Sequence, residues 1–470
     1  MHQVRARVRR AGGDARRRRS VKATVVGGGL AGCEAAWALA ERGVAVTLCE
    51  MRPAVKTPAH QTDRLAEIVC SNTFKSTELT NAHGLLKAEL RLLGSLLLDV
   101  ADQARVPGGA ALAVDRKVFS DEVTRRVRGH PRITVVREEV TDLPSPAVVA
   151  TGPLTSDALA RVIAARLGAT SLAFYDAIAP IVSADSLDLD RLYRLSRYGK
   201  GSGDDYLNAP LSAEEYYAFV DALMGAEQFE GHEFDKMPAP PAYFEGCLPI
   251  EEMARRGKDV LRFGPMKPVG LPDPATGREP FAVVQLRQED RAAQMWNLVG
   301  FQTRMKIPAQ KRVFSTLPGL ERAEFLRYGS IHRNTYLNSP ATLTAHLSAR
   351  DDDHLLFAGQ LVGVEGYTES LGTGLLAGIN LARMLQGERP LVPPAETMLG
   401  ALLSYVHGTD PGHFQPMNAN FGLVPPMDRK VRDKQKKNAI LAERALGAMR
   451  GFAAAVGAGS AVTAVSAPSP

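Results

Sequence analysis

The sequence has little cysteine, little tryptophan and no long apolar run. Four cysteines and two tryptophans occur in 470 residues, and four thiols are too few for a disulfide framework. No two cysteines form a CxxC pair, which argues against a structural zinc centre and a thioredoxin-like redox centre, so we expect no metal. No stretch of about 18 uncharged apolar residues occurs, so we expect no membrane span and no membrane partner. The few thiols fit a reducing, cytoplasmic location.

The positive net charge is unevenly distributed. The whole chain carries +6, but residues 1–20 contain eight Arg and one Asp, and residues 428–450 contain eight Lys or Arg and three Asp or Glu. The long segment 21–427 is therefore net acidic, and the whole-chain charge is weak evidence for nucleic-acid binding. We expect a disordered Arg-rich leader over 1–20, a basic helical segment over 428–450 and a disordered, uncharged tail over 451–470.

A glycine-rich turn follows the first apolar run. Residues 23–26 and 44–48 have the pattern of buried strands, and residues 33–42 have the Ala, Leu and Glu content of a helix. Between the first strand and the helix lies the candidate cofactor-binding turn, formed by Gly27, Gly28, Gly29, Leu30, Ala31 and Gly32. Strand, glycine turn, helix and strand in this order are typical of a dinucleotide-binding unit.

Each glycine of this GxGxxG pattern has a physical role. Gly27 permits the tight turn, Gly29 lets a pyrophosphate approach the backbone, and Gly32 lets the helix and strand pack closely. The helix N-terminus offers N–H groups and partial positive charge to phosphates. Glu50, at the end of the second strand, would accept hydrogen bonds from ribose hydroxyls and repel a 2′-phosphate. These residues predict FAD or NAD at this site rather than NADP.

A second strand-to-glycine segment lies near the other end of the chain. Residues 355–358 are apolar and are followed by Gly359, Gly372, Gly374 and a predicted helix that runs to Met384. In flavoproteins of the two-dinucleotide-fold type, such a segment meets the ribityl chain and the isoalloxazine of FAD. The same pattern is common in other α/β proteins, so the residues alone leave FAD and NAD both open.

These segments predict an α/β fold. We expect an FAD-binding Rossmann-like domain of the two-dinucleotide-fold type, discontinuous over 21–155 and 350–427, with an inserted α+β substrate domain over 156–349. Further predicted elements are helices at 85–100 and 114–127 and strands at 133–137 and 147–150.

Two of the four cysteines lie in polar surroundings. Cys70 is followed by Ser71 and Asn72, and Cys247 precedes Pro249 and two glutamates, which predict a helix start. Partial positive charge at a helix N-terminus favours a thiolate. The other two, Cys33 and Cys49, lie in an apolar helix and strand and are interpreted as packing residues. The residues alone leave a structural and a catalytic role equally open for Cys70 and Cys247.

Nine segments together carry a more specific pattern. They are residues 26–32, 50–53, 57–60, 68–72, 263–271, 284–289, 299–303, 332–336 and 415–422. This pattern, over residues 22–450, resembles the folate- and FAD-dependent tRNA (uracil-5-)-methyltransferases, the TrmFO group. The resemblance implies that 5,10-methylenetetrahydrofolate donates a one-carbon unit and that reduced FAD carries and reduces it. It further implies that NADH or NADPH reduces the flavin and that the acceptor is C5 of the T-loop uridine at tRNA position 54.

The resemblance also implies roles for single residues. Cys247 is the expected nucleophile at uracil C6 and Cys70 the expected acid/base partner, although the order of the two thiols stays open. Residues expected near the folate or the flavin are Trp296, Tyr367, Glu365 and Arg287. Residues expected to contact tRNA are Arg304, Lys306, Lys311, Arg312, Lys434, Lys436 and Lys437.

Two other functions are compatible with parts of the sequence. One is the related flavoprotein that installs carboxymethylaminomethyl groups on wobble uridines with a partner GTPase; that family is typically longer, with a C-terminal helical domain. The other is an FAD-dependent oxidoreductase, which the missing CxxC pair and the segments 263–271 and 415–422 disfavour. The sequence gives no indication of oligomeric state.

Overall fold

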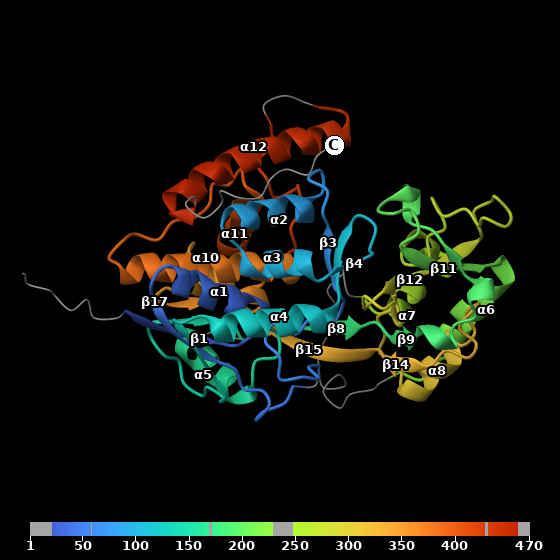
Figure 1. The fold of residues 1–470 in the computed structure, drawn as a ribbon, viewed down its shortest axis with the longest axis horizontal. Coiled ribbons are helices and arrows are strands. Elements are labelled where there is room, and N and C mark those ends of the chain that lie inside the picture. Colours follow the sequence, from blue (N-terminus) through green and yellow to red (C-terminus); the bar gives the residue numbers. More distant parts are fainter. Residues whose placement is uncertain (1–20, 58, 169–171, 229–247, 428–430, 459–470) are drawn as a thin grey trace, which may run out of the picture.

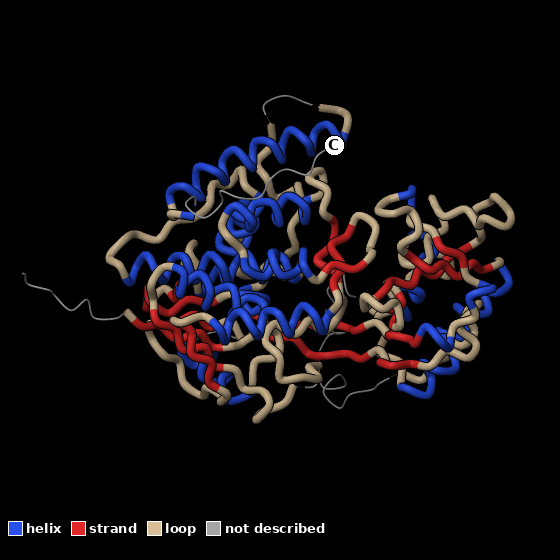
Figure 2. The backbone as a smooth tube through the Cα atoms, in the orientation of Figure 1, coloured by secondary structure: helices blue, strands red, loops and turns tan. Residues whose placement is uncertain are grey.

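The molecule has two lobes joined by a two-stranded ribbon. The computed structural model describes residues 21–57, 59–168, 172–228, 248–427 and 431–458 (Figure 1). Strands β8 (Leu172–Ile178) and β15 (Ser330–Tyr336) pair antiparallel along their whole length and run between the lobes. Helices dominate the large lobe, whereas strands, short helices and loops make up the small lobe (Figure 2).

The large lobe is built on a six-stranded sheet with the order β16-β17-β7-β1-β2-β6. The strands are β1 (Lys22–Val26), β2 (Ala45–Cys49), β6 (Ile133–Val136), β7 (Ala147–Val149), β16 (Ser348–Ala349) and β17 (Asp352–Phe357). All pairs are parallel except β16 with β17. Val26 is in register with both Cys49 and Val149, so the carboxyl ends of the central strands meet at one edge. Ligands of open parallel sheets bind at this edge.

Two long helices pack against each other on this sheet, α1 (Leu30–Glu41) and α10 (Tyr367–Leu385). A Cβ atom at Gly374 would lie 2.2 Å from the carbonyl oxygen of Ala31, and one at Gly378 would lie 2.5 Å from that of Ala35. Only glycine permits this approach of helix to backbone. This corrects the expectation that Gly374 and Gly372 meet a cofactor. Both are buried inside α10, and the space beside Gly372 is filled by Leu399 and Leu90.

The remaining elements of the large lobe surround this pair. They are α2 (Ala82–Leu92), α3 (Leu96–Gln103), α4 (Arg116–Gly129), α5 (Asp157–Leu167), α9 (Ser339–Thr342), α11 (Met398–Gly408) and α12 (Lys434–Ala455), with a small sheet of β3 (Thr73–Ser76), β5 (Ala111–Val114) and β4 (Arg105–Val106). The single helix predicted over 85–100 is in fact two helices. Gly94 has φ +83°, and the Ser95 hydroxyl accepts the N–H of Leu98 as the N-cap of α3.

The small lobe contains an antiparallel sheet with the order β10-β11-β12-β13-β9-β14. Its strands are β9 (Ile181–Ser183), β10 (Tyr193–Arg194), β11 (Tyr206–Leu211), β12 (Ala282–Gln288), β13 (Met295–Leu298) and β14 (Phe325–Arg327), and its helices are α6 (Ala213–Met224), α7 (Ile250–Arg255) and α8 (Ile307–Phe314). Its buried side chains, from Val182 to Ala323, form a hydrophobic core separate from that of the large lobe.

Two expected boundaries differ in the structure. The core of the large lobe reaches Ile163 on α5 and resumes at Leu337, so the flanks of the expected insert 156–349 pack with the large lobe. Helix α12 continues to Ala455, and Phe452 is buried in the same core, so the start of the expected disordered tail is helical. The burial of Phe452 on the inner face of α12 stabilises these last turns of the helix.

In the described part of the chain, no helix is both long and apolar enough to cross a bilayer. No group of three or more His, Cys, Asp or Glu side chains is arranged there to hold a metal ion.

The α1–α10 contact predicts a specific sensitivity. We expect Gly374→Ala to lower the free energy of unfolding by about 1–3 kcal/mol, because the added methyl group would overlap the Ala31 carbonyl oxygen. The matched control is Gly447→Ala on α12, where no atom lies within 4 Å of the added group. That change should raise stability by about 0.5–1 kcal/mol through helix propensity. Urea unfolding midpoints compare the two; equal effects would contradict the packing argument.

Candidate functional site

A pocket lies at the carboxyl edge of the parallel sheet, where α1 begins. It is lined by the turn from Val26 to Ala31, by Glu50 and Arg52 after β2, by residues 150–156 after β7, and by Gly359, Gln360, Tyr367 and Ser370 near α10. The space amounts to about 1030 Å³, part of it open to solvent. Each of these segments follows a central strand or begins a helix, so the fold itself brings them together.

The glycine turn has the shape of a phosphate cradle. Gly27 has φ +101°, and a Cβ there would lie 2.6 Å from the carbonyl oxygen of Ala150. A Cβ at Gly32 would lie 1.8 Å from the carbonyl oxygen of Gly27, so neither position accepts a side chain. Nothing lies within 4 Å of the same point at Gly29, which faces open space. Gly29 is also the N-cap of α1, and no side chain caps this helix end. The helix N-terminus can therefore bind an anion through its N–H groups.

The Glu50 side chain holds the glycine turn in place through hydrogen bonds. Its Oε2 accepts the N–H of Gly28 at 3.0 Å, and its Oε1 accepts the backbone N–H and the Nε of Arg52, both at 2.9 Å. Burial alone would raise the pKa of Glu50, but the hydrogen bonds and charge of Arg52 hold that pKa below its usual value. The carboxylate is thus ionised and lines the pocket, where its remaining lone pairs can accept hydrogen bonds from a ribose.

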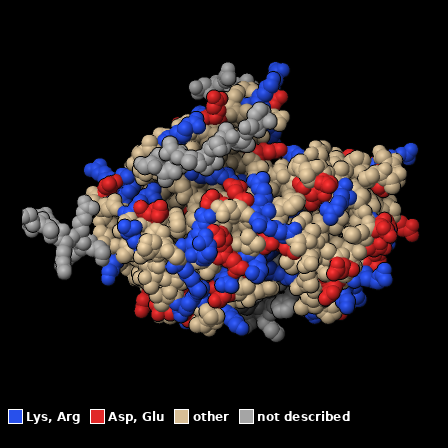
Figure 3. Space-filling view, in the orientation of Figure 1, with Lys and Arg blue, Asp and Glu red and all other residues tan. Residues whose placement is uncertain are grey.

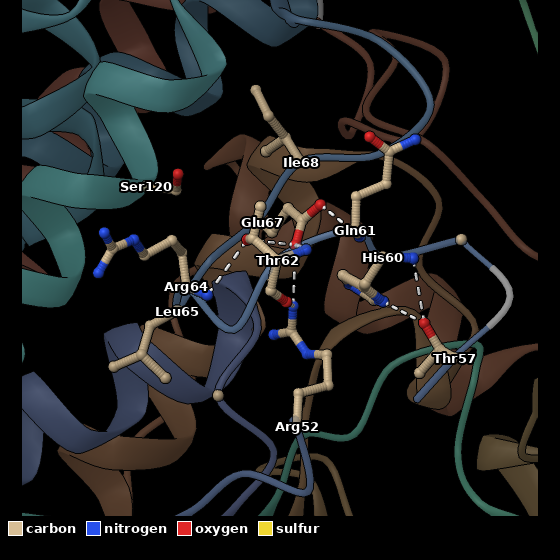
Figure 4. Close-up of polar contacts among 12 residues, drawn as sticks. Arg52, Thr57, His60, Gln61, Thr62, Arg64, Leu65, Glu67, Ile68 and Ser120 are labelled. Carbon is tan, nitrogen blue, oxygen red and sulfur yellow. Dashed lines mark hydrogen bonds and ion pairs between the residues drawn. The ribbon is translucent and has the colours of Figure 1, made fainter. Parts of the chain in front are cut away.

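Arg52 links Glu50 to a second acid, the half-buried Glu67, and Figure 4 shows the contact between Arg52 and Glu67. The guanidinium lies 3.0 Å from Glu67 Oε2, and Glu67 also accepts the N–H groups of Gln61 and Thr62. The loop over 59–67 is therefore held to the segment after β2 by one charge network. Sequence reasoning did not assign Arg52 or Glu67 a role; the available signal was a basic residue two positions after the acid that ends β2.

His60 of the same loop lines the pocket as a neutral ring. Its Nδ1 lies 2.6 Å from the hydroxyl of Thr57 (Figure 4). Burial and the nearby charge of Arg52 lower the pKa of His60 to about 4. The imidazole is therefore uncharged at neutral pH and presents an apolar face with a polar edge.

The distal segment reaches the pocket through Gly359 and Tyr367. Gly359 has φ +77°, and its N–H donates to the hydroxyl of Thr373 at 2.9 Å. The expected residue Glu365 accepts both hydrogen bonds of the Gln360 side-chain amide and is not among the pocket-lining residues. It therefore positions Gln360, which does line the pocket.

Cys70 lies beside Tyr367, the first residue of α10. The Tyr367 hydroxyl is 3.0 Å from Cys70 Sγ and accepts the N–H groups of Cys70 at 3.1 Å and of Ser71 at 3.2 Å. Arg116 on α4 donates to the carbonyl oxygens of Ile68 and Val69 and forms an ion pair with Glu289. The thiol is half-buried, and its segment is held from α4 and from α10.

Arg287 is near this segment but acts as a clamp. Its Nε donates to Asn72 Oδ1 at 2.8 Å, and a terminal nitrogen donates to the Ser71 hydroxyl at 3.1 Å. Asn72 in turn donates to the carbonyl oxygen of Gln288. Strand β12 of the small lobe therefore fixes the residues that follow Cys70.

Trp296 is placed in the hydrophobic core of the small lobe. It is 1% exposed on β13, and its indole N–H donates to the carbonyl oxygen of Ala293 at 3.0 Å. It does not line the pocket, which corrects the expectation that it stacks on a folate. An aromatic residue in an alternating strand is most often a core residue, and here packing explains it.

The remaining predicted residues are the other three cysteines and the tRNA contacts. Cys33 and Cys49 are buried, and Cys49 lines the pocket at the end of β2. Cys247 lies outside the described residues, although α7 begins directly after Pro249 as predicted. Of the predicted tRNA contacts, Arg304 is ion-paired with Glu252 at 2.7 Å. The exposed cations form two separate groups, Lys306, Lys311 and Arg312 at α8 and Lys434, Lys436 and Lys437 at the start of α12.

The Glu50–Arg52 pair predicts a pH-dependent stability. The pKa of Glu50 is lower in the folded than in the unfolded chain, so the pair stabilises the fold above about pH 4.3, and this contribution is lost as the pH falls through the folded-state value. We expect Glu50→Gln to lower the free energy of unfolding by about 3 kcal/mol at pH 7 and to flatten the acid limb.

The matched control is Glu41→Gln, because Glu41, at the end of α1, is an exposed partner of His130. That change should cost at most about 1 kcal/mol. Urea titrations from pH 3 to pH 8 measure both variants. An acid limb as steep in Glu50→Gln as in the unmodified protein would contradict the assignment.

Known proteins are similar to this chain in sequence and in fold. A family model described as "Glucose inhibited division protein A" matches residues 22–389. The "Methylenetetrahydrofolate--tRNA-(uracil-5-)-methyltransferase TrmFO" of Geobacter sulfurreducens is 58% identical over 90% of this chain and 96% of its own length. The protein of that name from Moorella thermoacetica is 56% identical over 91% of this chain and 97% of its own length.

Among solved structures, Aquifex aeolicus GidA in its form II crystal has a TM-score of 0.66 at 15% identity, over 93% of this chain and 74% of that chain. Its form I crystal gives 0.63 at 17% identity, over 91% and 76%. These similarities show a shared fold. The chain therefore belongs to the glucose inhibited division protein A family and, within it, to the methylenetetrahydrofolate--tRNA-(uracil-5-)-methyltransferases of the TrmFO group.

Proposed function

We propose that this chain methylates C5 of the T-loop uridine at tRNA position 54, with 5,10-methylenetetrahydrofolate as the one-carbon donor, FAD as the redox cofactor and NADH or NADPH as the reductant. One observation carries the proposal: Tyr367 lines the dinucleotide pocket and also contacts the thiol of Cys70 at 3.0 Å. The cofactor pocket and a thiol are thus adjacent in a member of this family. We place the reaction in the cytoplasm.

The residues of the pocket fit FAD. The N–H groups at the start of α1 and the open space at Gly29 suit the pyrophosphate, and Glu50 suits a ribose. Gly359 and Gln360 of the distal segment line the same pocket and would hold another part of the dinucleotide. When bound, reduced FAD supplies the hydride that brings the transferred methylene to the methyl level.

Two thiols are proposed to act on the uracil ring. Uracil C5 is a poor nucleophile until a thiolate adds to C6 and gives an enolate, and we assign that addition to Cys247. C5 then forms the new bond to the methylene carbon. A base removes the C5 proton, a role we assign to Cys70, and the bond between the methylene carbon and the nitrogen that carried it breaks. After a hydride has been added to that carbon, loss of the Cys247 thiolate from C6 restores the C5–C6 double bond. The assignment of Cys247 rests on the resemblance alone, since it lies outside the described residues.

The groove at the start of α12 is the proposed contact for tRNA phosphates. It is formed by residues 80–83, residues 419–422 and the beginning of α12, and Arg432, Lys434 and Lys437 line it. No Asp or Glu occurs among the described residues that line this groove. On the face shown in Figure 3, Lys and Arg are otherwise interspersed with Asp and Glu. A one-signed cationic groove is what a phosphate backbone requires.

The two alternative functions explain less. The TrmFO proteins match over at least 94% of their own length, whereas GidA is longer, with 74% of its chain covered. A flavin oxidoreductase without a nucleic-acid substrate gives no reason for the cationic groove.

The methyl donor provides the decisive test. Unmodified tRNA transcript, NADPH and methylenetetrahydrofolate carrying ¹³C in the methylene group should give 5-methyluridine with ¹³C in its methyl group, located at position 54 by nuclease mapping and mass spectrometry. Cys70→Ala and Cys247→Ala should each abolish the product, while Cys33→Ala serves as the thiol control. Label arriving only from S-adenosylmethionine, or at a wobble uridine, would overturn the proposal.

The groove predicts a charge-dependent affinity. Replacing Lys434, Lys436 and Lys437 by Gln should weaken tRNA binding and lower the slope of log K against log salt concentration by about 0.7–0.9 for each phosphate that is no longer neutralised. The comparison variant carries Lys311→Gln and Arg312→Gln on α8. Filter binding from 50 to 300 mM salt measures both. An unchanged slope in the α12 variant would assign the groove another role.

A further inference from the structure

The Tyr367 hydroxyl has one proton to donate and two possible acceptors for it. A tyrosine hydroxyl has two lone pairs and one proton. The N–H groups of Cys70 and Ser71 occupy the lone pairs at 3.1 and 3.2 Å. The hydroxyl can donate its one hydrogen bond either to the carbonyl oxygen of Ser71 at 3.0 Å or to Cys70 Sγ at 3.0 Å. The ionisation state of the sulfur decides between the two.

A thiol and a thiolate differ strongly as acceptors. A neutral sulfur is a weak acceptor, so the proton then stays with the Ser71 carbonyl oxygen. A thiolate forms a charge-assisted hydrogen bond, which is about twice as strong as a neutral one. The hydroxyl can therefore turn to the sulfur when Cys70 loses its proton to solvent, and no heavy atom has to move.

The charged groups around Cys70 come from several elements. Arg116 on α4 and Arg327 on β14 contribute positive charge, Glu289 after β12 contributes negative charge and neutralises part of it, and Arg287 reaches the neighbouring Ser71. Burial and the neighbouring Cys70 raise the pKa of Tyr367 well above its usual range. The phenol therefore keeps its proton at neutral pH and can act as a hydrogen-bond donor.

We propose that Tyr367 is a positioning residue that holds Cys70 as a thiolate, donating its hydroxyl proton to Sγ while its oxygen fixes the backbone N–H groups of Cys70 and Ser71. The proposed function gives this thiolate its use, as the base that takes the uracil C5 proton. The interaction itself is independent of methyl transfer. The Tyr367 side chain also lines the cofactor pocket. The first residue of α10 therefore contacts both the pocket and the Cys70 thiol.

The test measures the ionisation of one thiol. The full-length, flavin-loaded protein is alkylated with iodoacetamide between pH 5 and pH 10, and the rate at the Cys70 peptide is followed by mass spectrometry. We expect Tyr367→Phe to move the midpoint upward by about one pH unit, a roughly tenfold loss of thiolate at neutral pH. The control is Tyr405→Phe, because that hydroxyl donates to the Gln415 carbonyl oxygen away from Cys70, and its midpoint should not move.

A second variant keeps the test decisive if Tyr367→Phe does not fold. A fluorinated tyrosine at position 367 retains every contact and is a stronger donor, so the Cys70 midpoint should move downward. An unchanged midpoint in either variant overturns the proposal. Methylation is measured separately. If Cys70→Ala retains methylation while Tyr367→Phe still shifts the midpoint, the proposed role of Cys70 fails and this inference stands.

Discussion

The close approach of α1 and α10 is the constraint on which the rest of the structure depends. Gly374 and Gly378 let α10 rest against the backbone of α1 at Ala31 and Ala35, with no side chain between them. Interiors are packed too densely for such a contact to be shifted cheaply. Since both helices begin at the pocket, one at Gly29 and the other after Gly366, the contact also sets the distance between the phosphate cradle and Tyr367. The packing of α1 against α10 therefore also determines where Tyr367 lies relative to the phosphate cradle.

The position of the thiol depends on a second, polar constraint. The segment after Cys70 is tied to the small lobe by Arg287 and Asn72, and the segment before it is tied to α4 by Arg116, which pairs with Glu289 after β12. These groups are buried or nearly so, and breaking a buried charge pair costs about 3–5 kcal/mol. The small lobe therefore contributes to the site by holding the Cys70 segment, and a change at its strand β12 acts on the thiol at a distance from the pocket.

Local pattern explains what could be predicted from the sequence. The glycine turn, Glu50 and the strands around them follow from neighbouring residues whose spacing itself encodes the geometry, and the structure places them as predicted. Gly374 shows the limit, because a glycine at a helix contact and one at a cofactor have the same local appearance. Trp296 shows it again, since an aromatic residue on a strand gives no sign of which face is the core. Cys70 and Tyr367 are 297 positions apart, and no periodicity connects them.

Charge of one sign is confined to small parts of the molecule. The chain carries a net charge of +6, but the face shown in Figure 3 mixes both signs, and a single-signed groove is formed where α12 meets residues 80–83 and 419–422. Helix α12 covers α2 along the upper side of the large lobe in the view of Figure 1, and α8 lies at the lower side of the small lobe. If the α12 groove binds tRNA phosphates, as proposed, that contact and the Cys70 segment lie on the same lobe, and β12 of the small lobe holds the Cys70 segment in place.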